Sequence, residues 1–321
     1  MCTHLVDGYT VRPATLRDAP ALHALIAASD IADWGEPGGY SLGEVEDDLR
    51  GIDPERDSWL VTSPDGEVAG YANLHHRQHV RMDVEGYVHP DHVGQGVGTT
   101  LVQKSEARAR EHVPLAPDGT RVVVQNWINA DNRSACALLE REGYDPARYF
   151  FRMEATLTDA LPEPEWLASI SIRTCEDDSS RRLMYEAMED AMRDHWGHIP
   201  RSFEQWMERK SGSTFDPSLW FLAMDGNDPV AGAVCSISEE IGWVESLGVR
   251  APWRKRGLGM ALLRHAAREF RDRGLDRMVL GVDAENPTGA TRLYGRAGMH
   301  VAQRHATYRK VLREGLDPAT S

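Results

Sequence analysis

The residues best suited to chemistry lie in a glycine-rich stretch of the 321-residue chain, between a predicted strand that ends at Val249 and a predicted helix. Gly257 and Gly259 let the backbone there approach a ligand closely. Such a turn presents several backbone N–H groups beside the positive end of a helix, and together these bind a pyrophosphate. Basic side chains and the first helical residues belong to the same candidate phosphate site: Arg250, Arg254, Lys255, Arg256, Leu258 and Met260.

A second glycine-rich turn lies 161 residues earlier, after Val88. It contains Gly94, Gly96 and Gly98. One glycine cluster is often an ordinary tight turn. Two clusters at a fixed offset, each between a strand and a helix, predict a nucleotide-like ligand for one or both.

The same offset recurs along the chain and indicates a tandem duplication. It relates Arg12 to Arg173 and Trp59 to Trp220, and later landmarks follow in the same order. The segment between the copies contains two prolines and several acidic residues, which is typical of a solvated linker. We therefore expect a first domain at 1–158, a linker at 159–168 and a second domain at 169–321.

Each copy repeats one order of predicted elements: strand, helix, hairpin, strand, glycine turn, helix, strand, helix and a closing strand. In the first copy these are 9–12, 19–28, 59–62 with 68–74, 83–88, 99–112, 121–124 and 133–142. In the second copy they are 170–173, 181–192, 220–224 with 230–236, 243–249, 260–273, 277–282 and 289–297. The pattern predicts an α/β fold with a mixed sheet, made twice.

These motifs resemble the GCN5-related N-acetyltransferase (GNAT) superfamily. The acyl-CoA signature of that family, Arg/Gln-x-x-Gly-x-Gly/Ala, is matched from Arg254 to Gly259, and a second family feature follows from Asn286 through Tyr294 to Gly298. The resemblance covers nearly the whole chain as two units. It implies transfer of an acetyl group from the co-substrate acetyl-CoA to an amine, by direct attack in a ternary complex.

The resemblance also implies roles for individual residues. In the family, the backbone at Leu247, Gly248 and Val249 polarises the thioester carbonyl, and the tyrosine at the position of Tyr294 protonates the departing thiolate. Glu245 precedes Leu247 and Val249 by two and four residues, so alternation predicts that it shares their strand face and takes the amine proton through water. The alternative for Glu245 is an ion-paired strand residue without a catalytic role.

The first copy departs from the family at the corresponding positions. It has Val93, Val84 and Leu139 where the second copy has the arginine of the signature, the glutamate and the tyrosine. We expect the second copy to catalyse. The first copy is then a scaffold or a regulatory CoA site, because its glycines are kept and its proton-transfer side chains are not.

Other polar clusters leave alternatives open. Asn286 is a candidate cofactor contact, or it caps the following helix. His75, His76 and His79 could bind a metal, but a strand–turn setting without nearby cysteine favours a solvated hairpin, so no metal is predicted.

The segment 194–200, with Phe203 and Trp206 after it, is either an acceptor pocket or core packing. Met184, Met188 and Met192 recur every four residues, which indicates the buried face of a helix.

Composition narrows the remaining functions. The net charge is −14, of which residues 1–160 contribute −12 (14 Lys and Arg against 26 Asp and Glu). The excess is either a solvating surface or a field for a cationic acceptor, and it argues against nucleic acid as a partner. No apolar run could span a membrane, and no secretory leader is recognisable.

Four dispersed cysteines favour reduced thiols in a cytoplasmic protein. Together with the family resemblance, which implies an amine acceptor, we expect a monomer or homodimer acting on a small-molecule amine. The alternative is a non-catalytic acetyl-CoA sensor or interaction protein.

Overall fold

The computed structural model describes residues 4–193, 195–286 and 288–317, and the chain folds into two compact units. Unit 1 contains the chain up to Phe150 and from Arg304 onward, and unit 2 is Phe151–Gln303. These units are not the two sequence repeats, because strands β6 (Asp145–Thr156) and β12 (His300–Arg313) each pass from one unit into the other. Each unit is therefore completed by a strand segment of the other repeat.

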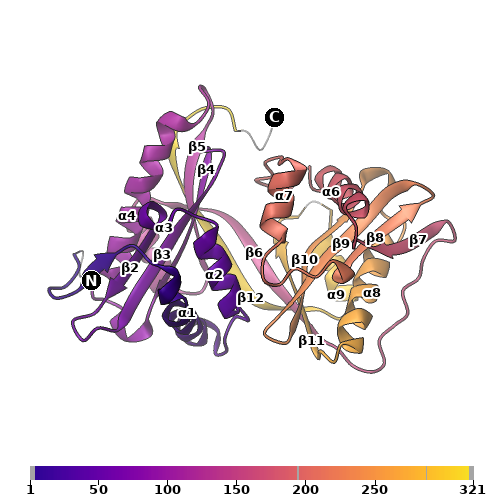
Figure 1. Cartoon of the computed structure of the whole chain (residues 1–321), viewed down its shortest axis with the longest axis horizontal. Helices are drawn as coiled ribbons and strands as arrows, with labels where there is room; N and C mark the ends of the chain where they lie inside the picture. Colours follow the sequence, from indigo (N-terminus) through magenta and orange to yellow (C-terminus); the bar gives the residue numbers. More distant parts are fainter. Residues whose placement is uncertain (1–3, 194, 287, 318–321) are drawn as a thin grey trace. The chain divides into compact units, whose positions relative to one another are not determined.

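Unit 1 is a mixed sheet with strand order β1-β2-β3-β4-β5-β12. Only β4 and β5 pair in parallel among its described strand pairs, and Figure 1 shows β12 beside β5. Its other strands are β1 (Thr10–Arg12), β2 (Ser58–Thr62), β3 (Val68–Arg77), β4 (Arg81–Val88) and β5 (Val122–Asn129). Its helices are α1 (Ala19–Trp34), α2 (Leu42–Arg50), α3 (Pro54–Asp57), α4 (Val97–His112) and α5 (Arg133–Arg141).

Unit 2 repeats this plan with strand order β6-β11-β10-β9-β8-β7. Strands β10 and β11 are its parallel pair. Its other strands are β7 (Ile170–Thr174), β8 (Trp220–Asp225), β9 (Asp228–Ser238), β10 (Ile241–Val249) and β11 (Arg277–Asp283). Its helices are α6 (Asp178–Met192), α7 (Phe203–Lys210), α8 (Leu258–Asp272) and α9 (Ala290–Arg296). The predicted mixed α/β fold, made twice, is confirmed.

Helices cover both faces of the unit 2 sheet. A Cβ placed on Gly232 of β9 would lie 3.1 Å from Cε of Met184 in α6, and one on Gly242 of β10 would lie 2.8 Å from Cδ1 of Phe270 in α8. Met184 and Met188 are buried against the sheet, so the predicted methionine face of α6 is confirmed. The sheet is thus sandwiched between α6 on one face and α8 on the other.

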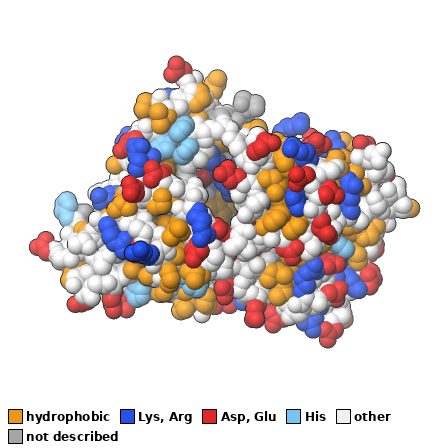
Figure 2. Space-filling model, in the orientation of Figure 1, with side chains coloured by type: hydrophobic (Ala, Val, Ile, Leu, Met, Phe, Trp, Pro, Cys, Tyr) orange, Lys and Arg blue, Asp and Glu red, His pale blue; other side chains and the backbone are white. Residues whose placement is uncertain are grey.

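The predicted elements are all present, with boundaries shifted by a few residues. Helices α2, α3 and α7 were not predicted, although α2 and α7 begin with capping boxes at Ser41–Glu44 and Ser202–Gln205. In the described part of the chain, no helix combines the length and apolar character needed to cross a membrane. Acidic and basic side chains are interspersed on the face that Figure 2 shows.

Cysteines Cys136, Cys175 and Cys235 are free thiols, as expected, and Cys2 lies outside the described residues.

Candidate functional site

Strand β10 of unit 2 has one extra residue, Glu245. Its antiparallel register with β9 pairs Val244 with Cys235 and Ser246 with Val234, so Glu245 forms a β-bulge. The parallel pairing with β11 runs only from Gly242 to Val244. Beyond the bulge, β10 continues along β9, while the described pairing on its β11 side has ended.

This opening leaves two backbone N–H groups on the β11 side. The N–H of Arg250 donates to the carbonyl oxygen of Val230 in β9 at 3.0 Å. Because successive N–H groups of a strand point to opposite sides, that of Gly248 also points to β9, and those of Leu247 and Val249 point away from it. The geometry suits donation from β10 to a carbonyl oxygen placed at the opened edge.

The bulge also changes which residues share a face. Leu247 and Val249 lie on the α8 face, since a Cβ on Gly259 of α8 would lie 3.7 and 3.8 Å from their side chains. Glu245 instead forms an ion pair with Lys210 at the end of α7, which packs with α6 on the opposite face. The prediction that Glu245 shares a face with Leu247 and Val249 is therefore wrong, because simple alternation fails at a bulge.

The charge state of Glu245 follows from this setting. Burial alone would raise the pKa of Glu245, but the charge of Lys210 and hydrogen bonds from Lys210 and Ser236 bring it below its usual value of 4.5. The side chains of Glu245 and Lys210 are 30% and 20% exposed. Glu245 is therefore an ionised, ion-paired carboxylate that solvent can reach.

The glycine turn after β10 leads directly into α8. Lys255 and Gly257 both have positive φ angles, +62° and +89°, and Gly257 is the N-cap of α8. The first N–H groups of a helix have no intrahelical acceptor, and glycine has no side chain to cap them. A Cβ on Gly257 would meet no atom of the described residues within 4 Å. The helix N-terminus therefore faces open space and is available to an anion.

The basic side chains of the turn are partly used by the protein itself. Arg254 donates from Nε to the carbonyl oxygen of Val249 at 3.0 Å and from Nη2 to that of Ala191 at 3.1 Å. Arg250 pairs with Asp190 at 2.9 Å. These contacts give Arg250 and Arg254 a role in fixing the turn, beside the phosphate contact that the sequence predicts for them.

The third basic group, Arg256, lies over the ring of Trp253, 4.8 Å from its centroid. Lys255 has the left-handed backbone conformation. Neither Lys255 nor Arg256 takes part in the hydrogen bonds and ion pair just described for Arg250 and Arg254. Leu258 is buried in the core, while Met260 is partly exposed in the first turn of α8.

Tyr294 of α9 lies in the same buried cluster as Leu258 and Leu262 of α8, and Leu247 and Val249 pack against this cluster. The structure therefore brings Tyr294 to the region of the opened strand. The side chain is 7% exposed, and burial raises the pKa of Tyr294 to about 12. The phenol keeps its proton at neutral pH and can donate it.

Asn286 organises the turn before α9. Its Oδ1 accepts a hydrogen bond from the N–H of Thr288 at 2.8 Å, and its own N–H donates to Asp283. The N-cap of α9 is Gly289, so Asn286 shapes the turn without capping the helix directly.

The aromatic residues predicted as either an acceptor pocket or core packing have different surroundings in the structure. Trp206 is buried against Trp220, with ring centroids 5.2 Å apart, which is core packing. Phe203 contacts Tyr185 and lies under the guanidinium of Arg182. Asp194, the first residue of this segment, lies outside the described residues.

Unit 1 differs at the corresponding turn. The register of β4 against β3 runs from Arg81 to Val88 without a shift, so the described strand has no bulge at Val84. The backbone of His4 and Leu5 lies against Gly96, where a side chain would begin, and the N–H of Val6 donates to Gln95 at 3.1 Å. The N-terminal segment thus covers the glycine turn of unit 1, unlike the open turn at Gly257.

Sequence reasoning missed Lys210 and His112. A capping box announces α7 but cannot show that its last residue reaches Glu245, 35 residues later. His112, the last residue of α4, lies beside His76 and His79 and has no sequence motif in common with them.

Comparison with protein families defines the class. The two stretches 20–144 and 181–299 match the acetyltransferase (GNAT) family, so the chain belongs to this family. It is an acyl-CoA-dependent N-acetyltransferase with two GNAT units.

Individual relatives match this chain over nearly its whole length. The mycothiol acetyltransferase of Nocardia farcinica is 31% identical over 95% of this chain and 96% of its own. That of Parafrankia sp. is 28% identical over 94% and 98%. Among solved structures, a GCN5-related N-acetyltransferase from Sphaerobacter thermophilus is 41% identical, with a TM-score of 0.85 over 99% of this chain and 100% of that one.

Proposed function

We propose that unit 2 transfers the acetyl group of acetyl-CoA to the primary amine of a small molecule, by direct attack of the amine while both substrates are bound. The observation that carries the proposal is the open, glycine-capped N-terminus of α8 next to the opened edge of β10. A pyrophosphate at this helix end would direct the thioester along β10 toward the N–H groups of Leu247 and Val249.

The residues of unit 2 have distinct roles in this proposal. The neutral amine attacks the carbonyl carbon, a C–N bond forms, and the C–S bond breaks. The N–H groups of Leu247 and Val249 stabilise the oxyanion, and one good donor of this kind contributes about 3–4 kcal/mol. Tyr294 gives its proton to the leaving sulfur and regains one from solvent. Glu245 accepts the amine proton through water on the α7 face.

Unit 1 has a scaffold role in this proposal. Its turn is covered by His4 and Leu5, and its strand lacks the bulge. We therefore expect one acetyl-CoA per chain, bound by unit 2.

The acceptor in this proposal is a small molecule with a primary amine. The architecture is similar to that of mycothiol synthase, which acetylates a cysteinyl amino-sugar, and the relatives named above support an acceptor of that kind. The carboxylate of Glu245 fits any ammonium or amine group that approaches from the α6 and α7 face.

The test is to incubate the protein with acetyl-CoA and a panel of amines that includes cysteinyl amino-sugars, polyamines and aminoglycosides. Release of CoA thiol is followed, and each product is identified by mass. Thiol release matched by acetylated amine supports the proposal. Tight acetyl-CoA binding without thiol release over the whole panel would favour a sensor.

A further inference from the structure

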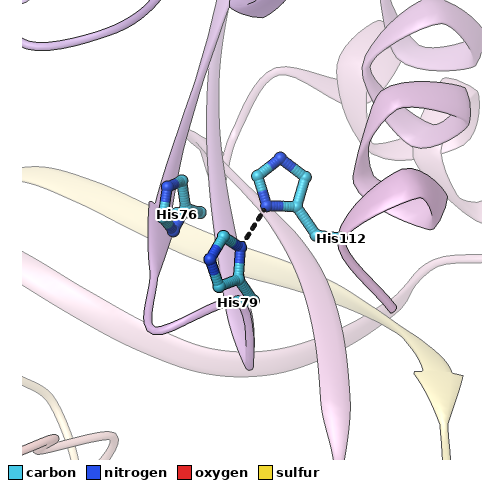
Figure 3. Close-up of side chains that lie close together, drawn as sticks. All are labelled: His76, His79 and His112. Atoms are coloured by element: carbon cyan, nitrogen blue, oxygen red, sulfur yellow. Dashed lines mark hydrogen bonds between the residues drawn. The ribbon is translucent and has the colours of Figure 1, made fainter. Parts of the chain in front are cut away.

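Three histidines from separate parts of unit 1 meet at one place (Figure 3). His76 lies near the end of β3, His79 lies in the turn between β3 and β4, and His112 is the last residue of α4. One ring nitrogen from each lies within 4.8 Å of the other two. The fold therefore joins a hairpin tip to the end of a helix through three imidazoles.

The rings are in direct contact. Nδ1 of His79 and Nδ1 of His112 form a hydrogen bond at 2.8 Å, drawn as a dashed line in Figure 3. The rings of His76 and His79 stack with centroids 4.2 Å apart, and that of His112 lies 4.8 and 5.0 Å from them. Tetrahedral Zn–N bonds of about 2.05 Å place the ligating nitrogens about 3.4 Å apart, and one nitrogen from each of the three rings already lies within 4.8 Å of the other two.

His112 has an unsatisfied buried nitrogen. Its side chain is 2% exposed, and its Nε2 has no hydrogen-bond partner among the described residues. This nitrogen lies on the side of the ring that faces away from His79, and it is Nδ1 of His112 that faces the other two histidines.

The backbone holds His79 in an uncommon conformation. Gln78 and His79 have φ angles of +50° and +59°, in the left-handed region that asparagine and glycine adopt more readily. The corresponding hairpin turn of unit 2 has the same backbone at Glu239 and Glu240, with φ angles of +48° and +60°, so this conformation is a feature of the turn in both units, and histidine tolerates it. In unit 1 the turn places the ring of His79 against those of His76 and His112.

We propose that His76, His79 and His112 bind one divalent transition-metal ion, with Zn²⁺ as the ion that three imidazoles suit and water as a further ligand. Imidazole nitrogen is a common ligand of zinc, and an open fourth position is typical of three-histidine sites. His76 is exposed, which gives the ion a path from solvent. When the ion replaces the His79–His112 hydrogen bond, the bonded proton moves to the other nitrogen of the same ring, so the imidazoles stay neutral.

The charged groups around the cluster oppose one another. Arg108 is the nearby cation, and it pairs with the buried carboxylate of Asp57 at 2.7 Å and with Glu111 at 2.7 Å. Two carboxylates therefore neutralise much of its charge. The site uses none of the residues proposed for acetyl transfer.

The experiment uses the full chain, without a histidine tag and stripped of metal by a chelator. Zn²⁺ is titrated in competition with a chromophoric chelator, and Co²⁺ is added separately to record the absorption bands of tetrahedral coordination. The variants are His76→Gln, His79→Gln and His112→Asn. The matched control is His75→Gln, because His75 is next to His76 in β3 and points to the opposite face of the strand.

We expect one Zn²⁺ per chain, bound at least about tenfold more weakly by each of the three variants and unchanged by His75→Gln. We also expect zinc to raise the Tm of the wild-type chain and not that of His76→Gln. If His112→Asn does not fold, as judged by circular dichroism, His76→Gln and His79→Gln decide. The proposal is overturned if no saturable zinc binding occurs, or if His76→Gln and His79→Gln bind zinc as the control does.

Discussion

Glu245, the extra residue of β10, forms an ion pair with Lys210, the last residue of α7. The bulge is what turns the carboxylate toward α7, away from the α8 face that holds Leu247 and Val249. An amine that approaches the thioester from this side meets a carboxylate already paired with an ammonium group. The same contact is consistent with a proton acceptor and with a purely structural ion pair, and substitutions separate the two.

We predict that Glu245→Gln lowers kcat by about 10²-fold or more, because the amine loses its proton acceptor. Stability should fall by about 1 kcal/mol or less, since the pair is partly exposed to solvent. Steady-state kinetics and urea unfolding measure the two effects. The matched control is Lys210→Met, which removes the pair and keeps the carboxylate. Equal losses of stability with unchanged turnover in both variants would make Glu245 structural.

The pH dependence tests the same pair. Because Lys210 outweighs burial and holds the pKa of Glu245 below 4.5, the carboxylate is ionised throughout pH 5–9 and gives no limb there. We expect kcat/KM to rise with pH only until the amine substrate loses its own proton. In Lys210→Met the effect of burial dominates, the pKa of Glu245 rises, and an acid limb moves toward neutral pH. If the pH profiles of kcat/KM are identical for the wild-type chain and Lys210→Met, Glu245 is not the proton acceptor.

The limits of sequence reasoning are visible at this residue. The identity and order of the strands around Glu245 follow from apolar patterns, and the glycine turn follows from its spacing. A bulge inserts one residue without any change in these patterns, so period-two alternation assigned Glu245 to the wrong face. The contact with Lys210 joins residues 35 positions apart, and no local rule predicts such a pairing.

Tyr294→Phe isolates the proposed acid. Burial raises the pKa of Tyr294 to about 12, so the phenol is fully protonated at pH 8. Removing the hydroxyl therefore slows the step in which the CoA thiolate leaves. We expect kcat to fall by about 10²-fold with little change in acetyl-CoA affinity. Tyr144→Phe is the control, because Tyr144 is a buried tyrosine of unit 1. A Tyr294→Phe variant with wild-type turnover would show that the ring only packs.

Gly257→Leu tests the proposed phosphate site. Gly257 has φ = +89° at the N-terminus of α8, and Gly274, just past the C-terminus of the same helix, has φ = +87°. Both positions are open to a side chain, and a leucine costs about 1–2 kcal/mol of backbone strain at either. We expect Gly257→Leu to abolish acetyl-CoA binding by calorimetry, whereas Gly274→Leu keeps one equivalent per chain. Loss of binding in both variants would point to stability and not to the turn.

The exchanged strands explain why the repeat border and the border of the compact units differ. The repeats are visible in the sequence as an offset of 161 residues, which indicates that the two halves arose by duplication. Which unit a strand joins depends on its neighbours in the sheet. Residues from His305 of β12 pair with β5 of unit 1, and Met153, Ala155 and Leu157 enter the core of unit 2. Neither fact has a signature in the sequence of the strand itself.

Two fragments therefore have different stabilities. The fragment 151–303 keeps the strand with Met153 and Leu157 in its core, and also the ion pair of Glu154 with Arg277 at 2.9 Å. The fragment 169–321 follows the sequence repeat, loses these residues and keeps residues 304–313 without their β5 partner. Because a buried Met or Leu contributes about 1.5–3 kcal/mol, we expect 151–303 to be the more stable by about 3 kcal/mol or more in urea unfolding. Equal unfolding midpoints would show that the repeat, and not the compact unit, is the folding unit.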